Sequence, residues 1–265
     1  MNLFFVSPRG LSLLLGTTLV MGSAIAQTTD SEESRLVFSV GAAQSNLTAR
    51  GIPSEKSRWG PLLGVDYSYG RFFAGTQRGI GYEVIKTKNF NAFASLFYSV
   101  GRKEGTLQDG PRFRGMGKIK PSGQVMVGFD WAPIDELLSF NSVTSVSIER
   151  GQGFTSAFGA SIGFPILDTL SGSLNISTTY GDRKYAQTYY GVTAAQSARS
   201  GNAAYNAKAG FFERQVSLGL EYKINPQWSA NGSLGRITRT GNAAKSPLYT
   251  RRGEPTAAIA LNYVY

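Results

Sequence analysis

The chain has 265 residues, a formal net charge of +10 at pH 7, and neither cysteine nor histidine. This composition excludes function classes that need disulfides, thiol nucleophiles, Ser-His relays or the usual zinc ligands, so any catalysis would rest on carboxylates alone. The length suits one domain with a large core or one closed barrel.

Residues 1–26 have the pattern of a secretory signal peptide. They contain one positive charge at Arg9, an apolar run over 11–21, and small residues at Ala24 and Ala26. The run is short and is interrupted by glycine and threonine, which disfavours the alternative of an uncleaved membrane anchor. We therefore predict an exported protein whose mature domain is residues 27–265.

Apolar residues then alternate with polar or small ones along most of the mature chain. FTSAFGASIGF (154–164), LSGSLNISTTY (170–180) and QVSLGLEYK (215–223) show this period of two. The pattern predicts strands with one apolar face, and roughly 9 to 14 residues are enough to cross a bilayer obliquely. The predicted strands are 35–43, 60–69, 71–75, 79–86, 90–101, 120–131, 137–150, 153–165, 168–181, 210–224, 227–239 and 253–265.

A soluble β-sandwich and an outer-membrane barrel share this pattern, but the connections separate them. The short connections are Gly70, 87–89, 132–136, 166–167 and 225–226; the long ones are 44–59, 102–119, 182–209 and 240–252. All the short ones follow even-numbered strands and all the long ones follow odd-numbered strands. A barrel with both ends in the periplasm sorts its connections in this way, whereas a sandwich has no reason to do so. We predict an all-β fold, a closed antiparallel transmembrane β-barrel of about 12 strands.

The final stretch, AAIALNYVY (257–265), alternates up to its last residue. In a closed barrel this strand pairs with the first one, because an open edge in lipid leaves backbone groups unsatisfied. The terminal aromatic, Tyr265, also resembles the signal by which such proteins are handed to the barrel-assembly machinery. An aromatic girdle is predicted at the periplasmic interface from Tyr69, Trp131, Phe140, Phe164, Tyr222, Trp228, Tyr263 and Tyr265.

Three stretches resemble the MipA/OmpV family of Gram-negative outer-membrane proteins (MltA-interacting protein-like). They are GPLLGVDYSYGRFFAGTQRGIGYEV (60–84), TYYGVTAAQSARSGNAAYNAKAG (188–210) and SPLYTRRGEPTAAIALNYVY (246–265). The family pattern falls on 189–192, on Gln196, Ser197 and Gly201, and on 246–248. The sequence departs from it near 44–53, where the Pro-Asp/Glu-Tyr stretch often seen after the first strand is not evident.

The resemblance implies location in the outer membrane of a Gram-negative cell, and it bears on function. One family member resembles a scaffold that joins a murein-degrading lytic transglycosylase to a murein synthase, so we expect a structural, scaffolding role. The alternative is a narrow pore or small-solute channel. We expect no enzymatic activity, because the carboxylates are scattered over different strands rather than paired as acid/base chemistry requires. No cofactor or metal site is predicted.

Strand parity places several polar side chains on the lumen side. They are Asp66, Asp130, Glu149, Glu221 and Lys223. A hydrated or packed lumen whose charges pair with one another explains them, and a solute pore or ligand pocket is the alternative.

Basic residues gather in the predicted outer loops. They are Arg112, Arg114, Lys118, Lys245, Arg251 and Arg252. Such side chains could contact the phosphates of lipopolysaccharide, and an ordinary solvated loop is the alternative. Nucleic acid is not expected as a partner, because the protein is exported.

The longest connection, 182–209, is rich in tyrosine, unlike a disordered tract. Its candidate residues are Tyr185, Tyr189, Tyr190, Gly191 and Tyr205. Either the segment folds inward as a plug in the barrel mouth, or it presents these rings to a partner. We favour the plug and expect it to rest on Asn175 and Glu221.

Overall fold

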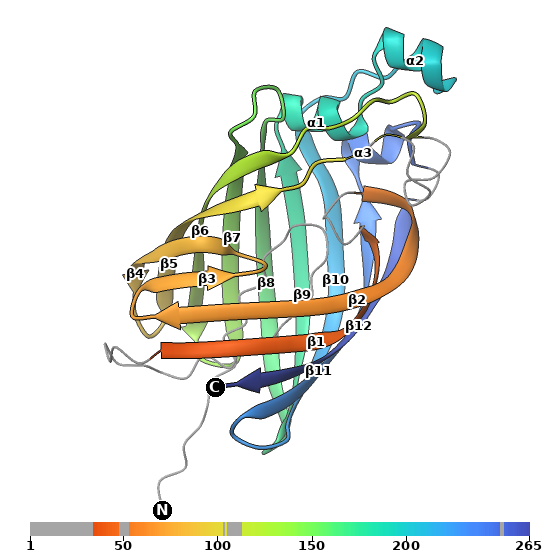
Figure 1. Ribbon diagram of the computed structural model, residues 1–265. Coiled ribbons are helices and arrows are strands. Elements are labelled where there is room, and N and C mark those ends of the chain that lie inside the picture. Colours follow the sequence, from red (N-terminus) through yellow and green to blue (C-terminus); the bar gives the residue numbers. More distant parts are fainter. Residues whose placement is uncertain (1–33, 48–52, 103, 105–112, 250–251) are drawn as a thin grey trace, which may run out of the picture.

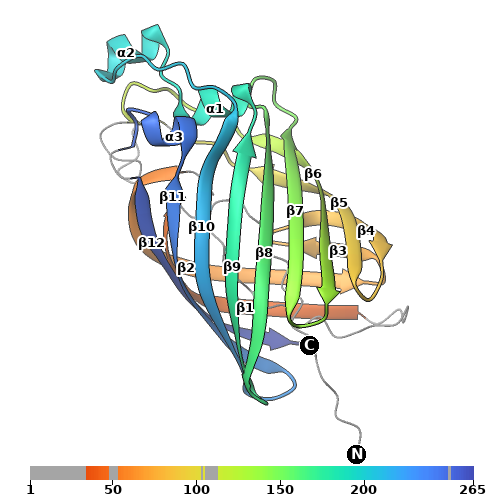
Figure 2. The ribbon, with the colours of Figure 1, turned by 180° about the vertical axis from the view of Figure 1, so that it is seen from behind.

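The computed structural model describes residues 34–47, 53–102, 104, 113–249 and 252–265, so the predicted signal peptide lies outside the described residues. These residues form a closed antiparallel barrel in which each strand pairs with its neighbours in the sequence and the last pairs with the first (Figures 1 and 2). The strands are β1 (Ser34–Leu47), β2 (Pro53–Tyr69), β3 (Phe72–Gly75), β4 (Gly79–Lys86), β5 (Phe90–Ser99), β6 (Ser122–Ile134), β7 (Leu138–Ser147), β8 (Phe154–Leu167), β9 (Leu170–Gly181), β10 (Gly210–Lys223), β11 (Trp228–Arg239) and β12 (Gly253–Val264). The predicted fold class and strand number are confirmed.

The first and last strands pair with each other and close the barrel. β1 and β12 are in register from Val37↔Val264 to Gln44↔Ala257. Tyr265 continues this ladder, because its backbone N–H donates to the Leu36 carbonyl at 2.8 Å and its carbonyl accepts from the Leu36 N–H at 3.2 Å. The backbone of the last residue is thereby satisfied within the sheet, as a barrel in lipid requires.

Successive side chains of a strand point to opposite faces, and this alternation separates the outer surface from the lumen. On β8, Phe158 and Ile162 lie exposed on the outside, while Thr155 and Ala157 are buried inside. The residues of the predicted girdle are outward-facing too, with Trp131 stacked on Phe140 and Trp228 against Tyr263. None of the helices in the described part of the chain is long and apolar enough to cross a membrane.

The lipid-facing assignment of β8 predicts an asymmetric response to charge. Phe158→Arg, near the middle of the outer belt, should lower the free energy of unfolding by about 2–4 kcal/mol, because the cation replaces an apolar side chain in lipid. Ser177→Arg on the inner face of the neighbouring β9 is the matched control and should change it by no more than about 1 kcal/mol. Urea titration of vesicle-inserted protein measures both values, and equal destabilisation would contradict the threading.

The connections differ in detail from the predicted ones. The expected long connection at 44–59 is wrong, because β1 extends to Leu47 and β2 begins at Pro53. Both strands gain length there by continuing one ladder, which reaches Leu47↔Pro53 through a register shift. β7 ends at Ser147, so Glu149 lies in the turn beyond it rather than in a strand facing the lumen.

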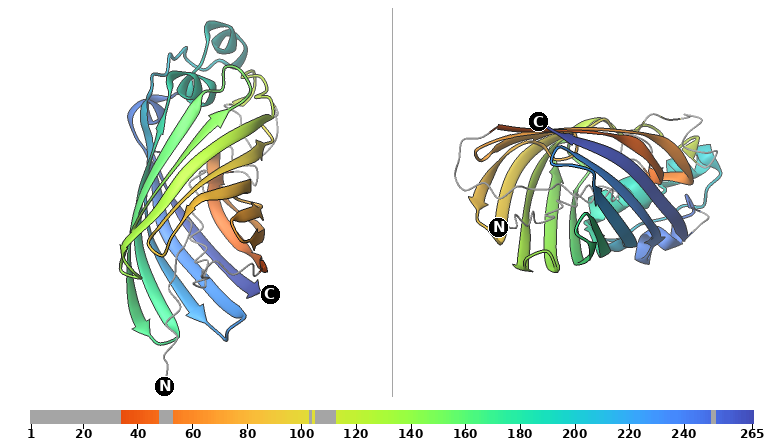
Figure 3. Two further views of the ribbon diagram at one scale, coloured as in Figure 1. Left: turned by 90° about the vertical axis from the view of Figure 1, so that its left-hand side faces the viewer. Right: turned by 90° about the horizontal axis from the view of Figure 1, so that it is seen from below.

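Short turns and long connections lie at opposite ends of the barrel (Figures 1 and 3). The short turns, together called the turn rim, are 70–71, 87–89, 135–137, 168–169 and 224–227. The C-terminus lies on the turn-rim side. The long connections 182–209 and 240–252 fold at the other end, called the mouth, and both contain helices.

Three short helices form at the mouth: α1 (Arg183–Tyr190), α2 (Ala194–Ser200) and α3 (Gly241–Lys245). α1 begins at Asp182, whose side chain accepts from the Tyr185 N–H, and α2 begins with a capping box between Thr193 and Gln196. These caps satisfy backbone donors that a helix leaves unpaired at its start. Local contacts therefore stabilise both helices of the loop.

Candidate functional site: the mouth of the barrel

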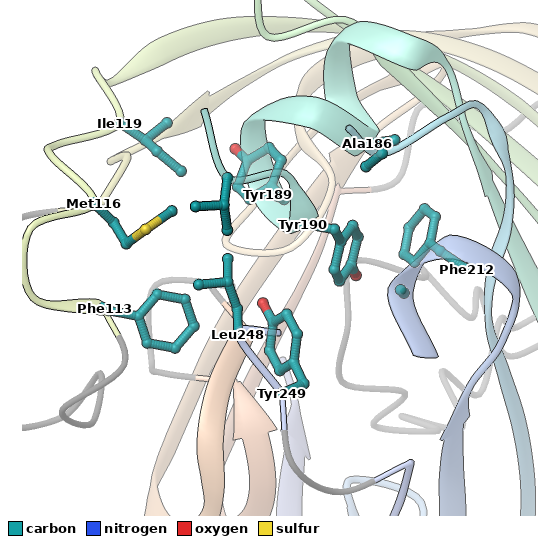
Figure 4. Packing of buried hydrophobic residues seen from close by; sticks show 12 residues of the cluster. Phe113, Met116, Ile119, Ala186, Tyr189, Tyr190, Phe212, Leu248 and Tyr249 are labelled. Carbon is teal, nitrogen blue, oxygen red and sulfur yellow. The ribbon is translucent and has the colours of Figure 1, made fainter. Parts of the chain in front are cut away.

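A cluster of buried apolar side chains lies at the mouth (Figure 4). It draws on four stretches that are distant in the sequence: the end of the 100–121 connection, the 182–209 connection, the start of β10 and the 240–252 connection. We call it the mouth cluster, and it consists of Phe113, Met116, Ile119, Ala186, Tyr189, Tyr190, Val192, Ala207, Phe212, Ala243, Leu248 and Tyr249. Tyr185 and Tyr205 pack against it while partly exposed.

Aromatic rings run continuously through this cluster. Tyr185 stacks on Phe212 with ring centroids 5.2 Å apart, and Phe212 contacts Tyr190 at 5.3 Å. Tyr190 in turn meets Tyr249 at 5.4 Å, and Tyr249 meets Phe113 edge to face at 5.8 Å. Ring contacts at these distances add attraction beyond the burial of apolar area. The chain of contacts therefore joins α1, β10 and two further loops across the opening.

Hydrogen bonds fix the loops to one another around these rings. The Ser246 hydroxyl donates to the Tyr190 carbonyl at 2.6 Å, and the Tyr205 hydroxyl donates to the Asn242 carbonyl at 2.9 Å. Val192 and Tyr205 form an isolated antiparallel bridge with both N–H···O distances at 2.8 Å. The 182–209 connection is thus a folded element attached to 240–252.

Burial keeps the tyrosines of the mouth cluster neutral. It raises the pKa of Tyr249 to about 12, against the opposing effect of the nearby Arg239 and Arg102 guanidinium groups. Burial also raises the pKa of Tyr185 and of Tyr190 well above the ordinary value of a tyrosine. The hydroxyls therefore stay protonated at physiological pH, and the packing of the mouth does not depend on their titration.

A buried ion pair adjoins the rings where β11 and β12 reach the mouth. Arg239 Nη1 lies 3.1 Å from Glu254 Oε1, and both side chains are almost fully buried, at 3% and 2% exposed. The Arg239 guanidinium also lies over the Tyr249 ring, 4.4 Å from its centroid. A second cation–π contact places Arg102 over Phe113 at 4.7 Å. The charges are compensated by direct partners, as burial requires.

One protein family matches most of this chain. Residues 38–265 match the family described as "MltA-interacting protein MipA". The chain belongs to this MipA family. The family predicted from the sequence motifs is thereby confirmed, and with the closed twelve-stranded wall it makes the chain an outer-membrane β-barrel.

Three proteins that are similar to this chain share at most a quarter of its residues. The chain is 25% identical over 243 residues to the "24 kDa outer membrane protein" of Pasteurella multocida (strain Pm70), covering 86% of this chain and 93% of that protein. Among solved structures, the NanC porin gives a TM-score of 0.48 with 11% identity, covering 86% of this chain and 98% of that one. The anion-selective porin from Comamonas acidovorans gives 0.39 with 9% identity, covering 88% and 98%.

The candidate loop residues of this MipA-family barrel lie together at the mouth. Tyr189 and Tyr190 are buried, Tyr185 and Tyr205 pack beside them, and Gly191 ends α1. Their expected support on lumenal residues is wrong. The Asn175 side chain is hydrogen-bonded within the wall, to Ser161 and Ser173, and the loops rest on the mouth cluster instead. Rings from three separate connections bury one another at the mouth. The loop is therefore stabilised there without contacting the polar side chains deeper in the lumen.

Four of the five predicted lumen residues, Asp66, Asp130, Glu221 and Lys223, lie toward the turn-rim ends of their strands. Asp66 is paired with Arg78 at 2.7 Å, and Lys86 approaches Glu83 at 3.4 Å on the same side of the barrel. Asp130 and Lys223 lie half-buried and Glu221 lies buried, near the turn-rim ends of β6 and β10. Glu149 sits outside the wall and contacts Lys120 at 3.2 Å. No cluster of carboxylates suited to a metal occurs within the described residues.

Basic side chains lie exposed on the outer surface of the mouth. Arg114, Lys118, Lys245 and Arg252 are exposed, whereas Arg112 and Arg251 lie outside the described residues. The exposed four are spread over two connections.

Sequence reasoning missed much of the mouth. Phe113, Phe212, Leu248 and Tyr249 were not predicted as plug residues, and neither was the Arg239–Glu254 pair. One signal could have found part of it: Ser246, Pro247 and Leu248 form a family motif in a loop, where a buried leucine has no strand to explain it.

Proposed function

We propose that this MipA-family barrel is an envelope scaffold that holds a murein-degrading lytic transglycosylase, and with it a murein synthase, at the outer membrane. The observation that carries the proposal is the mouth cluster, in which rings from four stretches of chain are buried against one another. We infer that this packing obstructs the path along the barrel axis, which a barrel built for flux keeps open. The family description names an interaction with MltA, which agrees with a binding role.

The turn rim is the surface that we propose for docking. Murein enzymes work in the periplasm, and the short turns of an outer-membrane barrel face that side. The rim carries charges of both signs. The Lys88 ammonium in one turn lies 3.8 Å from the Asp135 carboxylate in another, and Asp168 is exposed in the turn between β8 and β9. Such a mixed polar edge suits contact with a soluble partner.

Site-specific photocrosslinking in intact envelopes tests this assignment. A photoreactive residue replacing Lys88 or Asp168 should give a covalent adduct with a lytic transglycosylase, identified by mass spectrometry. The same residue replacing Arg114 or Lys245 at the mouth is the matched control and should give none. Adducts from the mouth positions alone would refute the docking surface, and adducts from neither end would refute the scaffold.

A narrow pore is the second candidate, and one observation favours it. Inward positions of β9 and β10 carry polar side chains such as Asn175, Thr179 and Ser217. A polar lumen of this kind can hold a hydrated path. Stable unitary steps from the unmodified protein in a planar bilayer would favour this function over the scaffold.

Further features of the protein belong to the same proposal. Residues 1–26 would be removed on export, and the barrel-assembly machinery would recognise the end of β12 at Tyr265. The exposed Arg114, Lys118 and Lys245 would contact phosphates of lipopolysaccharide. The protein would act by binding rather than by catalysis.

A further inference from the structure

Two arginines lie on the outward face of the barrel wall. Arg214 on β10 and Arg236 on β11 are both exposed. Each lies two residues along its strand from an exposed apolar side chain, Val216 on β10 and Leu234 on β11, so all four face outward. A cation is unfavourable at the middle of the lipid-facing belt but is tolerated at its edge, so the height of these arginines decides their role.

The two arginines stand near the mouth-side edge of this belt. Arg214 lies eight residues from Tyr222 along β10, and Tyr222 is an outward ring near the turn rim. Arg236 lies eight residues from the outward ring of Trp228 along β11. At about 3.4 Å per residue and an inclination of about 40°, the arginine backbones stand roughly 20 Å above these rings, against a belt about 25 Å tall. A long side chain directed toward the mouth reaches the edge of the belt from there.

The Arg236 side chain is directed toward the mouth. In the β11–β12 ladder, Arg236 is opposite Pro255, and Gly253 is opposite Thr238, which is two residues nearer the mouth. The guanidinium nevertheless lies over Gly253, where a Cβ would be 2.8 Å from Arg236 Nη2. The absence of a side chain at Gly253 therefore leaves room for the guanidinium at the level of Thr238.

Outward aromatic rings line the mouth-side ends of the neighbouring strands. Phe211 on β10 is 49% exposed and meets Tyr180 on β9 edge to face, with ring centroids 5.6 Å apart. Tyr180 in turn lies 6.2 Å from Phe154 on β8. Membrane barrels carry aromatic rows at both interfaces. Phe211 precedes Arg214 by three residues, so Arg214 lies beside the row that marks the mouth-side interface.

Arg214, Thr238 and Arg236 form one compact group on this outer surface. In the β10–β11 ladder, Arg214 is opposite Thr238 and Val216 is opposite Arg236, so the two arginines are diagonal neighbours. Diagonal positions of an antiparallel pair are about 7–8 Å apart, which lets two long side chains reach one small anion. The Thr238 hydroxyl, on the same face, can donate a further hydrogen bond. Guanidinium groups suit phosphate because each can donate two parallel hydrogen bonds to it.

The carboxylates of the five strands β8 to β12 all point away from these arginines. They are Glu213, Glu221 and Glu254, and each is buried on the lumen side. Two neighbouring guanidinium groups repel each other, and the repulsion is stronger beside hydrocarbon than in bulk water. An anion held between them removes this repulsion. At the surface of a bilayer, the phosphates of lipid headgroups are abundant anions.

We propose that Arg214, Thr238 and Arg236 bind the phosphate of a lipid headgroup in the leaflet around the mouth. The acyl chains of that lipid lie on the turn-rim side of the arginines, where Val216 is 50% exposed and Leu234 is 67% exposed. A phosphorylated glycolipid has the chemistry that this site requires. The site rests on the proposed contact of the protein with lipopolysaccharide, which it extends from the loops to the wall, and it is independent of docking at the turn rim.

Native mass spectrometry of the folded protein in detergent, titrated with diphosphoryl lipid A, tests the site. Arg214→Gln combined with Arg236→Gln should weaken binding of the lipid by about tenfold or more, because both charge-assisted contacts to phosphate are lost. Arg183→Gln combined with Lys184→Gln is the matched control, which removes two exposed charges from α1 at the mouth. This control should change the affinity by less than about twofold.

Two measurements on the unmodified protein do not depend on the folding of a variant. Lipid A without phosphates should bind about tenfold more weakly or worse, and inorganic phosphate should not displace bound diphosphoryl lipid A. Equal affinity for both forms of lipid A would overturn the proposal, and displacement by inorganic phosphate would overturn it in favour of a site for free anions.

A loop variant separates failure of this site from failure of the proposed loop contact. Arg114→Gln combined with Lys245→Gln removes two exposed cations of the mouth connections. Loss of binding in this variant alone would overturn the wall site and leave the loop contact in place. Unchanged affinity in both the wall variant and the loop variant would overturn both.

Discussion

Deletion of residues 186–206 is expected to turn a silent barrel into a conducting one. The deletion removes α2, most of α1 and the rings of Tyr189 and Tyr190, so the mouth cluster loses its central members. The wall should survive, because β9 and β10 already meet at Gly181↔Gly210 and a short linker can join them. Unitary steps in planar bilayers, absent before the deletion, measure the effect.

A smaller excision in the same loop provides the control. Deletion of Ala194–Ser200 removes only α2, which has no buried residue, and the Val192↔Tyr205 bridge still closes the base of the loop. This variant should stay silent. A 186–206 variant that folds, as judged by heat-modifiable migration, yet remains silent and loses its envelope partners would contradict the plug and favour the alternative in which the loop presents its rings to a partner.

Arg239→Met is expected to be the most destabilising point substitution at the mouth. It leaves Glu254 buried without its cationic partner, and Glu213, which is opposite Arg239 in the β10–β11 ladder, loses the same neighbouring charge. Removing one member of a buried ion pair lowers the free energy of unfolding by about 3–5 kcal/mol. Urea unfolding of vesicle-inserted protein gives the value.

Two further variants separate charge from packing. Arg236→Met removes an exposed arginine from the same strand and should change the free energy of unfolding by about 0.5 kcal/mol or less. Arg239→Met combined with Glu254→Gln should recover part of the loss, because the second change removes the uncompensated carboxylate. Similar losses for Arg236→Met and Arg239→Met would show that the buried pair has no special weight.

The sequence by itself determined the strands and the closure of the wall. Period-two alternation is a local property, so segments such as 154–164 revealed both their conformation and their lipid-facing side. Connection lengths revealed the topology, because a barrel that crosses a membrane sorts its loops by side. The family motifs at 188–210 and 246–265 pointed to the loops that matter, without showing what they contact.

Only the tertiary structure decided which loops pack together at the mouth and how short the β3 ladder is. Phe113, Tyr190 and Tyr249 belong to three different connections, and no local pattern records which loops fold back to the same place. Arg239 and Glu254 meet because of the β11–β12 register, which places Ile237 opposite Glu254. The length of a ladder, as at β3, likewise depends on how far neighbouring strands run together, and that distance is set by closure of the whole barrel.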